Sequence, residues 1–318
     1  MSLSYIDVFN GDADGICALI QWRLSDPQKN QLVTGVKRDI NLLSQVQANA
    51  SSRICVFDIS FDSNRQDVMR LLGQGAIINY FDHHYAGQLI EHPNITLKIN
   101  PAPQICTSLL VNKVVGNQWR GWAIVGAFGD NLIDSAYKLA TGHYHEDELK
   151  TLQLMGQLIN YNAYGESLND LYISPSDLYK RLVMYASPLV AWDKEFELFQ
   201  ELKTTYDNDL YLASQIPVST LSEKVRIYIF PNQAWTRRVL GMYANKIINQ
   251  YPDQALAILI EKEQGIMISV RAPRTSPYGA DKVCLQFSGG GRAAAAGINA
   301  LPLVQKEDFI QAMQQVFS

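Results

Sequence analysis

Four short apolar segments lie in the first part of the chain, and each is followed by a polar or charged loop. They cover residues 5–9, 32–36, 53–57 and 75–81. A helical segment is expected after each loop, as in ICALIQWRL, which follows the loop NGDADG. Strands that alternate with helices are typical of a mostly parallel sheet with helices on both faces. The sequence therefore predicts an α/β fold for this part of the chain.

Acidic residues follow three of these segments at the points where strands should end. Asp12 and Asp14 come after the first segment, Asp58 after the third and Asp82 after the fourth. The carboxyl ends of parallel strands lie at one edge of a sheet, so these side chains should meet there. Carboxylates that meet in a partly dry cleft repel one another unless a cation lies among them. The pattern therefore predicts a cation site.

Two adjacent histidines, His83 and His84, directly follow Asp82. Carboxylates combined with imidazoles suit manganese, magnesium or zinc. Two such ions a few ångströms apart can hold the attacking and the leaving oxygen of a phosphoryl transfer. Phosphoryl-transfer chemistry is therefore the first functional expectation.

The rest of the chain divides into a helical stretch and a second α/β part. Apolar residues at helical spacing continue from residue 122 to about residue 212. Pro, Ser and Thr in SQIPVSTLSE, residues 214–223, indicate a boundary, and the strand-like segments VRIYIF, ALAILIE and GIMISVRA follow it. We expect a catalytic, metal-binding domain with its helical connector over residues 1–213, and a smaller α/β substrate-binding domain over residues 224–318.

Five motifs occur in a fixed order along the chain. NGDADG, FDIS, FDHH and FGDN come first, and GGGRAAAAG follows at residues 289–297. In this order and at these intervals they resemble the motifs of the DHH phosphoesterase superfamily, with the glycine-rich signature of the DHH-associated C-terminal domain. The resemblance covers nearly the whole chain, and the helical stretch near residues 140–215 is its vaguest part.

The resemblance implies two divalent cations, Mn²⁺ or else Mg²⁺. By position, Asp12 and Asp58 would hold the first ion. Asp14, Asp58, His83 and Asp130 would hold the second, so Asp58 would bridge both. A water activated by the two cations is the expected nucleophile.

Three further residues of these motifs carry implied roles. Asp82 would either orient His83 or shape the loop, and His84 would face the substrate phosphate as a polar or acidic contact. Asn10 stands where the family usually has His or Asp to complete the first ion's ligands. A neutral amide oxygen binds a hard cation more weakly than a carboxylate does, so the first site is expected to be weak.

The glycine-rich segment is expected to bind the anionic substrate. Its glycines let the backbone approach a ligand, and the alanines after them are expected to start a helix whose N–H groups favour an anion. Arg292 replaces the His of the family signature and offers a planar, charged fork to a phosphate. The residues expected to bind substrate are Arg271, Arg274, Gly289, Gly290, Gly291 and Arg292.

Charge and composition restrict the partners and the location. The chain has 27 Lys and Arg against 31 Asp and Glu, a net charge of −4, which does not suit a surface that coats long nucleic acids. It has no apolar stretch of the roughly 18 residues that a membrane span needs. The four cysteines show no C-x-x-C spacing, and the N-terminus has neither a basic start nor a long apolar run. A cytoplasmic protein is expected.

These observations predict a metal-dependent phosphoesterase that hydrolyses phosphodiester or phosphomonoester bonds of a small nucleotide, held between two domains. The expected partner is a short single-stranded oligonucleotide, a linear dinucleotide or another small phosphorylated compound, with a homodimer left open. A pyrophosphatase or polyphosphatase is one alternative. A nucleotide-binding regulatory protein with impaired chemistry is another, because of Asn10 and Arg292.

Overall fold

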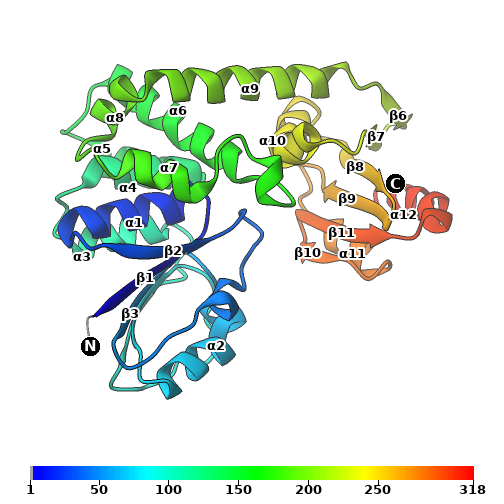
Figure 1. The fold of residues 1–318 in the computed structure, drawn as a ribbon. Helices are drawn as coiled ribbons and strands as arrows, with labels where there is room; N and C mark the ends of the chain where they lie inside the picture. Colours follow the sequence, from blue (N-terminus) through cyan, green and yellow to red (C-terminus); the bar gives the residue numbers. More distant parts are fainter. Residues whose placement is uncertain (1–2) are drawn as a thin grey trace. The chain divides into compact units, whose positions relative to one another are not determined.

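The chain folds into two compact units, which a computed structural model describes over residues 3–318 except for the side chain of residue 221. Unit 1 is Met1–Thr204 and unit 2 is Thr205–Ser318. The long helix α9 (Phe196–Gln215) runs across the division (Figure 1). The roles expected for the two predicted domains stay predictions.

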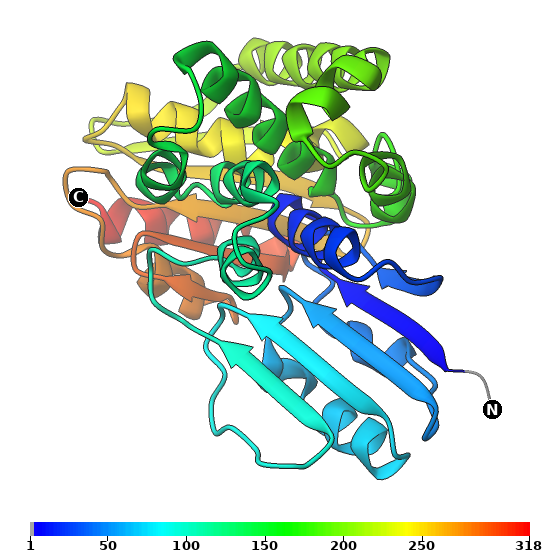
Figure 2. The same cartoon turned by 90° about the vertical axis from the view of Figure 1, so that its left-hand side faces the viewer.

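A five-stranded parallel sheet forms the base of unit 1 (Figure 2). Its order is β2-β1-β3-β4-β5, and every neighbouring pair is parallel. The chain leaves β1 in one direction to reach β2, whereas β3, β4 and β5 follow on the other side of β1. The carboxyl ends of β1 and β3 therefore lie at the switch point of the sheet, where loops diverge and leave room for a site. The strands are β1 (Ser4–Phe9), β2 (Asn30–Thr34), β3 (Ser52–Phe57), β4 (Ile77–Asp82) and β5 (Ile95–Ile99).

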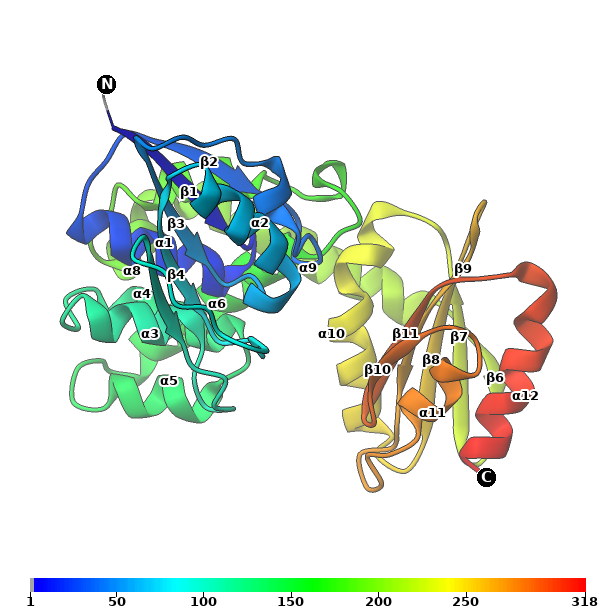
Figure 3. The ribbon, with the colours of Figure 1, turned by 90° about the horizontal axis from the view of Figure 1, so that it is seen from below.

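Helices cover both faces of this sheet (Figure 3). On one face, α2 (Phe61–Gly73) packs Val68 and Leu71 against strand residues such as Val8 and Val56. The short helix η1 (Leu42–Gln45) contributes to the same core. On the other face, Trp22 of α1 (Ala13–Ser25) packs on Phe57 and Phe81. Burial on both sides explains why the central strands are apolar almost throughout. The predicted α/β class is confirmed.

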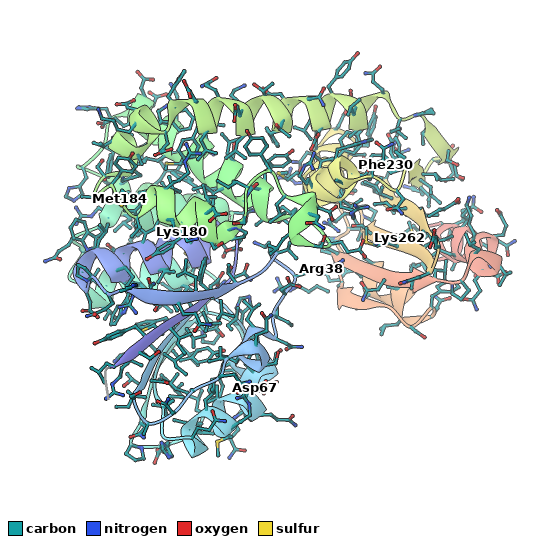
Figure 4. The ribbon with its side chains drawn as sticks, viewed as in Figure 1. Arg38, Asp67, Lys180, Met184, Phe230 and Lys262 are labelled. Carbon is teal, nitrogen blue, oxygen red and sulfur yellow. The ribbon has the colours of Figure 1, made fainter. Side chains whose placement is uncertain are left out.

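The expected helical stretch is confirmed as a layer of helices after the sheet. Its members are α3 (Thr107–Val114), α4 (Arg120–Gly129), α5 (Ile133–Ala140), α6 (Glu146–Ala163), η2 (Leu168–Asp170), α7 (Pro175–Leu182), α8 (Pro188–Lys194) and α9. Lys180 on α7 and the strongly exposed Met184 just after it lie at the surface of this layer (Figure 4).

The helix expected after the fourth apolar segment is wrong. An irregular loop at residues 83–94 joins β4 to β5, and β5 pairs with β4 in parallel. The segment ITLKI of β5 alternates half-buried and exposed residues, which is typical of an edge strand. A five-residue alternation is too short to be distinguished from a loop by pattern alone.

Unit 2 is built on a six-stranded mixed sheet of order β10-β11-β9-β8-β7-β6. The strands are β6 (Val218–Leu221), β7 (Val225–Phe230), β8 (Ala255–Lys262), β9 (Gly265–Arg271), β10 (Gly290–Arg292) and β11 (Ala295–Leu301). Helix α10 (Ala234–Gln250) lies against β8 and β9 on one face. Helices α11 (Ala280–Leu285) and α12 (Lys306–Val316) close the core on the other face, with η3 (Leu303–Gln305) before α12.

The glycine-rich segment forms a β-hairpin, so the helix expected at the alanines is wrong. β10 pairs with β11 in antiparallel register, with Gly291 opposite Ala296 and Arg292 opposite Ala295. Ala296 and Ile298 pack into the core beneath α11, which makes the alanine run a buried strand. This segment therefore has no helix N-terminus that could bind an anion.

Among the described residues, no helix combines the length and the apolar character that crossing a membrane requires.

Candidate metal centre

The first two acids, Asp12 and Asp14, are held by hydrogen bonds to the first turns of helices. Asp12 precedes α1 and caps it: its Oδ1 accepts the backbone N–H groups of Asp14 and Gly15, both at 3.1 Å. The two carboxylate oxygens of Asp14 accept the backbone N–H groups of Thr107 at 2.7 Å and Ser108 at 2.8 Å, at the start of α3. The carboxylate of Asp14, the second residue of α1, is therefore held against the start of α3, and the residue is only 1% exposed.

Asp58 directly follows β3 and has a left-handed backbone conformation, with a φ of 60°. This conformation is costly for a residue with a side chain, and such strain is concentrated at functional sites. The Thr107 hydroxyl donates to Oδ1 of Asp58 at 3.0 Å, and the Asp58 backbone N–H donates to the Phe81 carbonyl at 3.0 Å. These bonds hold the Asp58 carboxylate against α3 at the switch point of the sheet.

His83 and Asp130 complete the cluster. Nε2 of His83 lies 3.3 Å from Oδ1 of Asp58 and 3.7 Å from Oδ2 of Asp130. Asp130 follows α4, whose last residue, Gly129, lies so close to α1 that a Cβ there would come within 2.3 Å of the Ala13 Cβ. Glycine thus lets the end of α4 reach the start of α1. One ligand atom each from Asp14, His83 and Asp130 lie within 4.8 Å of one another, and so do those of Asp58, His83 and His84.

The electrostatics of this cluster fit a divalent cation. Burial raises the pKa of Asp58 well above its ordinary value, and the charges of Asp14 and Asp12 raise it further. Burial and the same two neighbours raise the pKa of Asp130 to about 7. A cation among these oxygens would relieve the repulsion, and a set of carboxylates with one imidazole suits Mn²⁺. The residues present therefore fit the metal that the sequence predicts.

Lys37 is a site residue that the sequence analysis missed. It lies in the loop after β2, next to Arg38 (Figure 4), and its Nζ is 2.5 Å from Oδ2 of Asp12 and 3.2 Å from Oδ1 of Asn160 on α6. Burial alone would raise the pKa of Asp12, but the charge and the hydrogen bond of Lys37, together with the backbone N–H of Gly15, outweigh burial and leave that pKa lowered. Burial alone would lower the pKa of Lys37, but Asp12 leaves it raised. The position of Lys37 after a strand is the signal that could have found it.

Asn10 lies in the same region with both ends of its amide engaged. Its Oδ1 accepts the backbone N–H of Asp12 at 3.2 Å, and its Nδ2 donates to the carbonyl oxygen of Lys37 at 3.2 Å. The side chain is buried. Asn10 therefore ties the loop after β1 to the loop after β2, and its role as a metal ligand stays a prediction.

Asp82 contacts the ring of His84 and the backbone of the loop. Its Oδ1 accepts the backbone N–H groups of His83 at 2.8 Å and His84 at 3.1 Å, and it lies 2.7 Å from Nδ1 of His84. Burial alone would lower the pKa of His84, but the bond and the charge of Asp82 leave it raised. Two roles were considered for Asp82: orienting His83 or shaping the loop. Its contacts to the loop backbone match the second role, and the ring that it contacts belongs to His84.

The residues predicted to bind substrate lie in unit 2, on the strands β9 and β10 or beside them. Arg292 of β10 is opposite Ala295 of β11, which is opposite Arg271 of β9. Residues in one such row point to the same face, so the two arginines flank a small alanine. Nε of Arg271 also donates to Oδ1 of Asn245 on α10 at 3.2 Å. Arg274 lies beyond β9, where its Nη1 donates to Asn249 of α10 at 2.7 Å.

Comparison with known proteins agrees with this architecture. Residues 217–318 match the DHHA1 domain family. A DHH domain of a member of the s1p family of ribosomal proteins is 13% identical, with a TM-score of 0.64 over 98% of this chain and 86% of that one. The exonuclease RecJ bound to manganese is 15% identical, with a TM-score of 0.62 over 98% of this chain and 89% of that one. The pGpG-specific phosphodiesterase PggH from Vibrio cholerae is 15% identical, with a TM-score of 0.58 over 98% of both chains.

At these identities the structural likeness shows the fold. A search of curated proteins finds no match to this chain. The chain is an α/β protein whose residues 217–318 match the DHHA1 domain family, with an acidic cluster in unit 1 that fits a divalent cation. The DHHA1 match confirms the resemblance noted from the motifs for residues 217–318, and the solved structures confirm the fold of the chain.

Proposed function

We propose that the chain is a metal-dependent phosphoesterase that hydrolyses a phosphoester bond of a short oligonucleotide or a linear dinucleotide. The observation that carries this proposal is the convergence of Asp14, Asp58, His83 and Asp130, from three strand ends and a helix end, within a few ångströms. The DHHA1 match of unit 2 supports the same reaction class. RecJ structures with Mn²⁺ and with Mg²⁺ support a divalent cation as the cofactor.

The residues of the cluster would have two roles, metal binding and contact with the substrate. A divalent cation bound here would supply Lewis acidity toward a phosphoryl oxygen and toward water. Asp14 and Asp58 would hold it from buried positions that α3 fixes. His84 is 46% exposed at its side chain, and the bond and charge of Asp82 raise its pKa against the effect of burial, so it can bind a phosphate oxygen or give a proton to the leaving oxygen.

A small substrate suits the charges of the chain. Arg271 and Arg292 share one face of the sheet of unit 2 and can bind one phosphate group together. A net charge of −4 does not provide the basic track that a long nucleic acid requires. Two structural relatives, an exonuclease and a pGpG-specific phosphodiesterase, have activities within the proposed class. The comparisons do not support a homodimer, and the proposed chemistry needs one chain.

A substrate panel tests the proposal. Metal-stripped protein is reloaded with Mn²⁺ or Mg²⁺ and incubated with linear dinucleotides, oligonucleotides of increasing length and inorganic pyrophosphate. We expect cleavage of dinucleotides and the shortest oligonucleotides only with metal present. Asp14→Asn should abolish cleavage, while Asp67→Asn on the outer side of α2 should not (Figure 4).

Two results would favour the alternatives. Phosphate release from pyrophosphate, with intact dinucleotides, would indicate a pyrophosphatase. Nucleotide binding without turnover under either metal would indicate a regulatory binding protein.

A further inference from the structure

The charged partner of Asp12 is a lysine. Oδ2 of Asp12 lies 2.5 Å from Nζ of Lys37, while Oδ1 accepts two backbone N–H groups at the start of α1. The charge of this carboxylate is thus already paired with an ammonium. Asp12 belongs to neither of the groups of candidate ligands found among residues 3–318, whereas Asp14, Asp58, His83 and Asp130 all do.

Lys37 is held in this position by several contacts. Its Nζ also donates to Oδ1 of Asn160, its backbone N–H donates to the carbonyl of Ala163, and its ammonium lies 5.6 Å from the ring centre of Tyr164. The side chain is 29% exposed. The contacts come from α6 and the residue after it, so the orientation of Lys37 is set by the fold of unit 1 as well as by Asp12.

Asn10 also helps to hold Lys37 beside Asp12. Its Nδ2 donates to the carbonyl of Lys37, a bond that a carboxylate at position 10 could not make. Asparagine at position 10 carries no charge, and the ammonium of Lys37 offsets the negative charge of Asp12. The pair of Asp12 and Lys37 beside the neutral Asn10 therefore carries no net charge that a second cation would have to balance.

We infer that the centre holds one divalent cation, on Asp14, Asp58, His83 and Asp130, and that the ammonium of Lys37 takes the place of a second cation beside Asp12. This inference rests on the proposed phosphoesterase function. An ammonium has three N–H donors, and two of them point to Asp12 and Asn160. The third can bind a phosphoryl oxygen of the substrate and stabilise the charge that develops there.

Metal stoichiometry tests the inference without any measurement of turnover. Metal-stripped protein is titrated with Mn²⁺, with free ion followed by electron paramagnetic resonance and bound metal measured after gel filtration. We expect one Mn²⁺ per chain at saturation. Two ions per chain would overturn the inference and leave the proposed function standing, whereas no bound ion would overturn the proposed function.

Two variants test the role of Lys37. Lys37→Met should retain one Mn²⁺, bound as tightly as before or several-fold more tightly because a neighbouring positive charge is gone. Its kcat should fall by about 100-fold or more, the usual effect of removing one donor to a developing oxyanion. The double variant Asn10→Asp with Lys37→Ala should bind a second Mn²⁺. A double variant that still binds one ion, or a Lys37→Met protein with unchanged kcat, would contradict the inference.

Lys150→Met provides the matched control. Lys150 is an exposed lysine on α6 that pairs with Glu146 and Asp147. The control should retain the wild-type stoichiometry and kcat. Thermal unfolding of each metal-free variant checks that the variant folds. If a variant fails to fold, the number of Mn²⁺ ions bound per wild-type chain still tests the inference.

Discussion

The hydroxyl of Thr107 donates to Oδ1 of Asp58 at 3.0 Å, while the backbone N–H of the same residue donates to Oδ2 of Asp14 at 2.7 Å. One residue at the start of α3 therefore orients two acids that come from different strands. Partners of this kind fix the direction of ligand lone pairs and tune their basicity.

Thr107→Val should weaken metal binding while keeping the fold. Valine has nearly the same shape and retains the backbone N–H to Asp14, but it cannot donate to Asp58. Loss of such a supporting bond typically costs about 10–100-fold in metal affinity. Titration with Mn²⁺ measures the change. Thr141→Val, at the exposed end of α5, serves as the control and should leave the affinity as it is.

Asp58→Asn should abolish activity and metal binding, yet stabilise the metal-free protein. Burial and the surrounding carboxylates oppose the charge of Asp58, and asparagine tolerates the φ of 60° well. Removal of this charge should raise the free energy of unfolding by about 1–2 kcal/mol, because functional residues often destabilise the fold that carries them. Denaturant unfolding without metal measures it. Turnover retained by the variant would contradict the placing of Asp58 at the centre.

The metal-free protein should lose stability as the pH rises from about 4 to about 7. The pKa of Asp130 is raised to about 7 and that of Asp58 is also raised, so the folded state binds more protons than the unfolded state in this range. Stability then falls with increasing pH, by at most about 4 kcal/mol for Asp130. Thermal unfolding at pH 5 and pH 7 tests this, and Asp130→Asn should flatten the difference. For the same reason, Mn²⁺ affinity should increase over this range, because binding displaces protons.

The sequence predicted the parts of the site that obey a positional rule. Asp12, Asp14 and Asp58 follow strands of a parallel sheet, and the structure brings their charges close enough to shift the pKa of Asp58. Lys37 obeys the same rule at the end of β2, but a lysine does not suggest a metal site. Thr107 could not be found, because its contact to Asp58 depends on the docking of α3 against α1, which no local pattern encodes.

The errors in the fold have local causes. The alanine run after Gly291 has high helix propensity, but Ala296 and Ile298 bury one face of it as a strand, and tertiary packing outweighs propensity. The edge strand β5 was missed because five alternating residues give too weak a signal.

Gly290 and Gly291 should respond differently to alanine. A Cβ at Gly291, where φ is 145°, would lie 2.5 Å from the Ala296 Cα, whereas a Cβ at Gly290 would meet nothing within 4 Å. Gly291→Ala should therefore lower the free energy of unfolding by about 1–3 kcal/mol. Gly290→Ala should change it by less than about 0.5 kcal/mol. If Gly290 faces the substrate, its variant should raise KM without a change in stability, and an unchanged KM would place the substrate elsewhere.

Arg292→Ala should raise KM and leave the metal bound. Arg292 is exposed in unit 2 and shares a row with Arg271 through Ala295, so it can contribute a fork of N–H donors to the substrate phosphate. Loss of a charged hydrogen bond of this kind costs about 1.5–3 kcal/mol, which corresponds to roughly a 10–150-fold rise in KM. Arg292→Lys keeps the charge and loses the fork, so it should recover part of the affinity. Steady-state kinetics with a linear dinucleotide separates KM from kcat, and metal analysis of the same protein checks occupancy. Loss of metal in Arg292→Ala, with KM unchanged, would show that this arginine supports the metal centre and does not bind the phosphate.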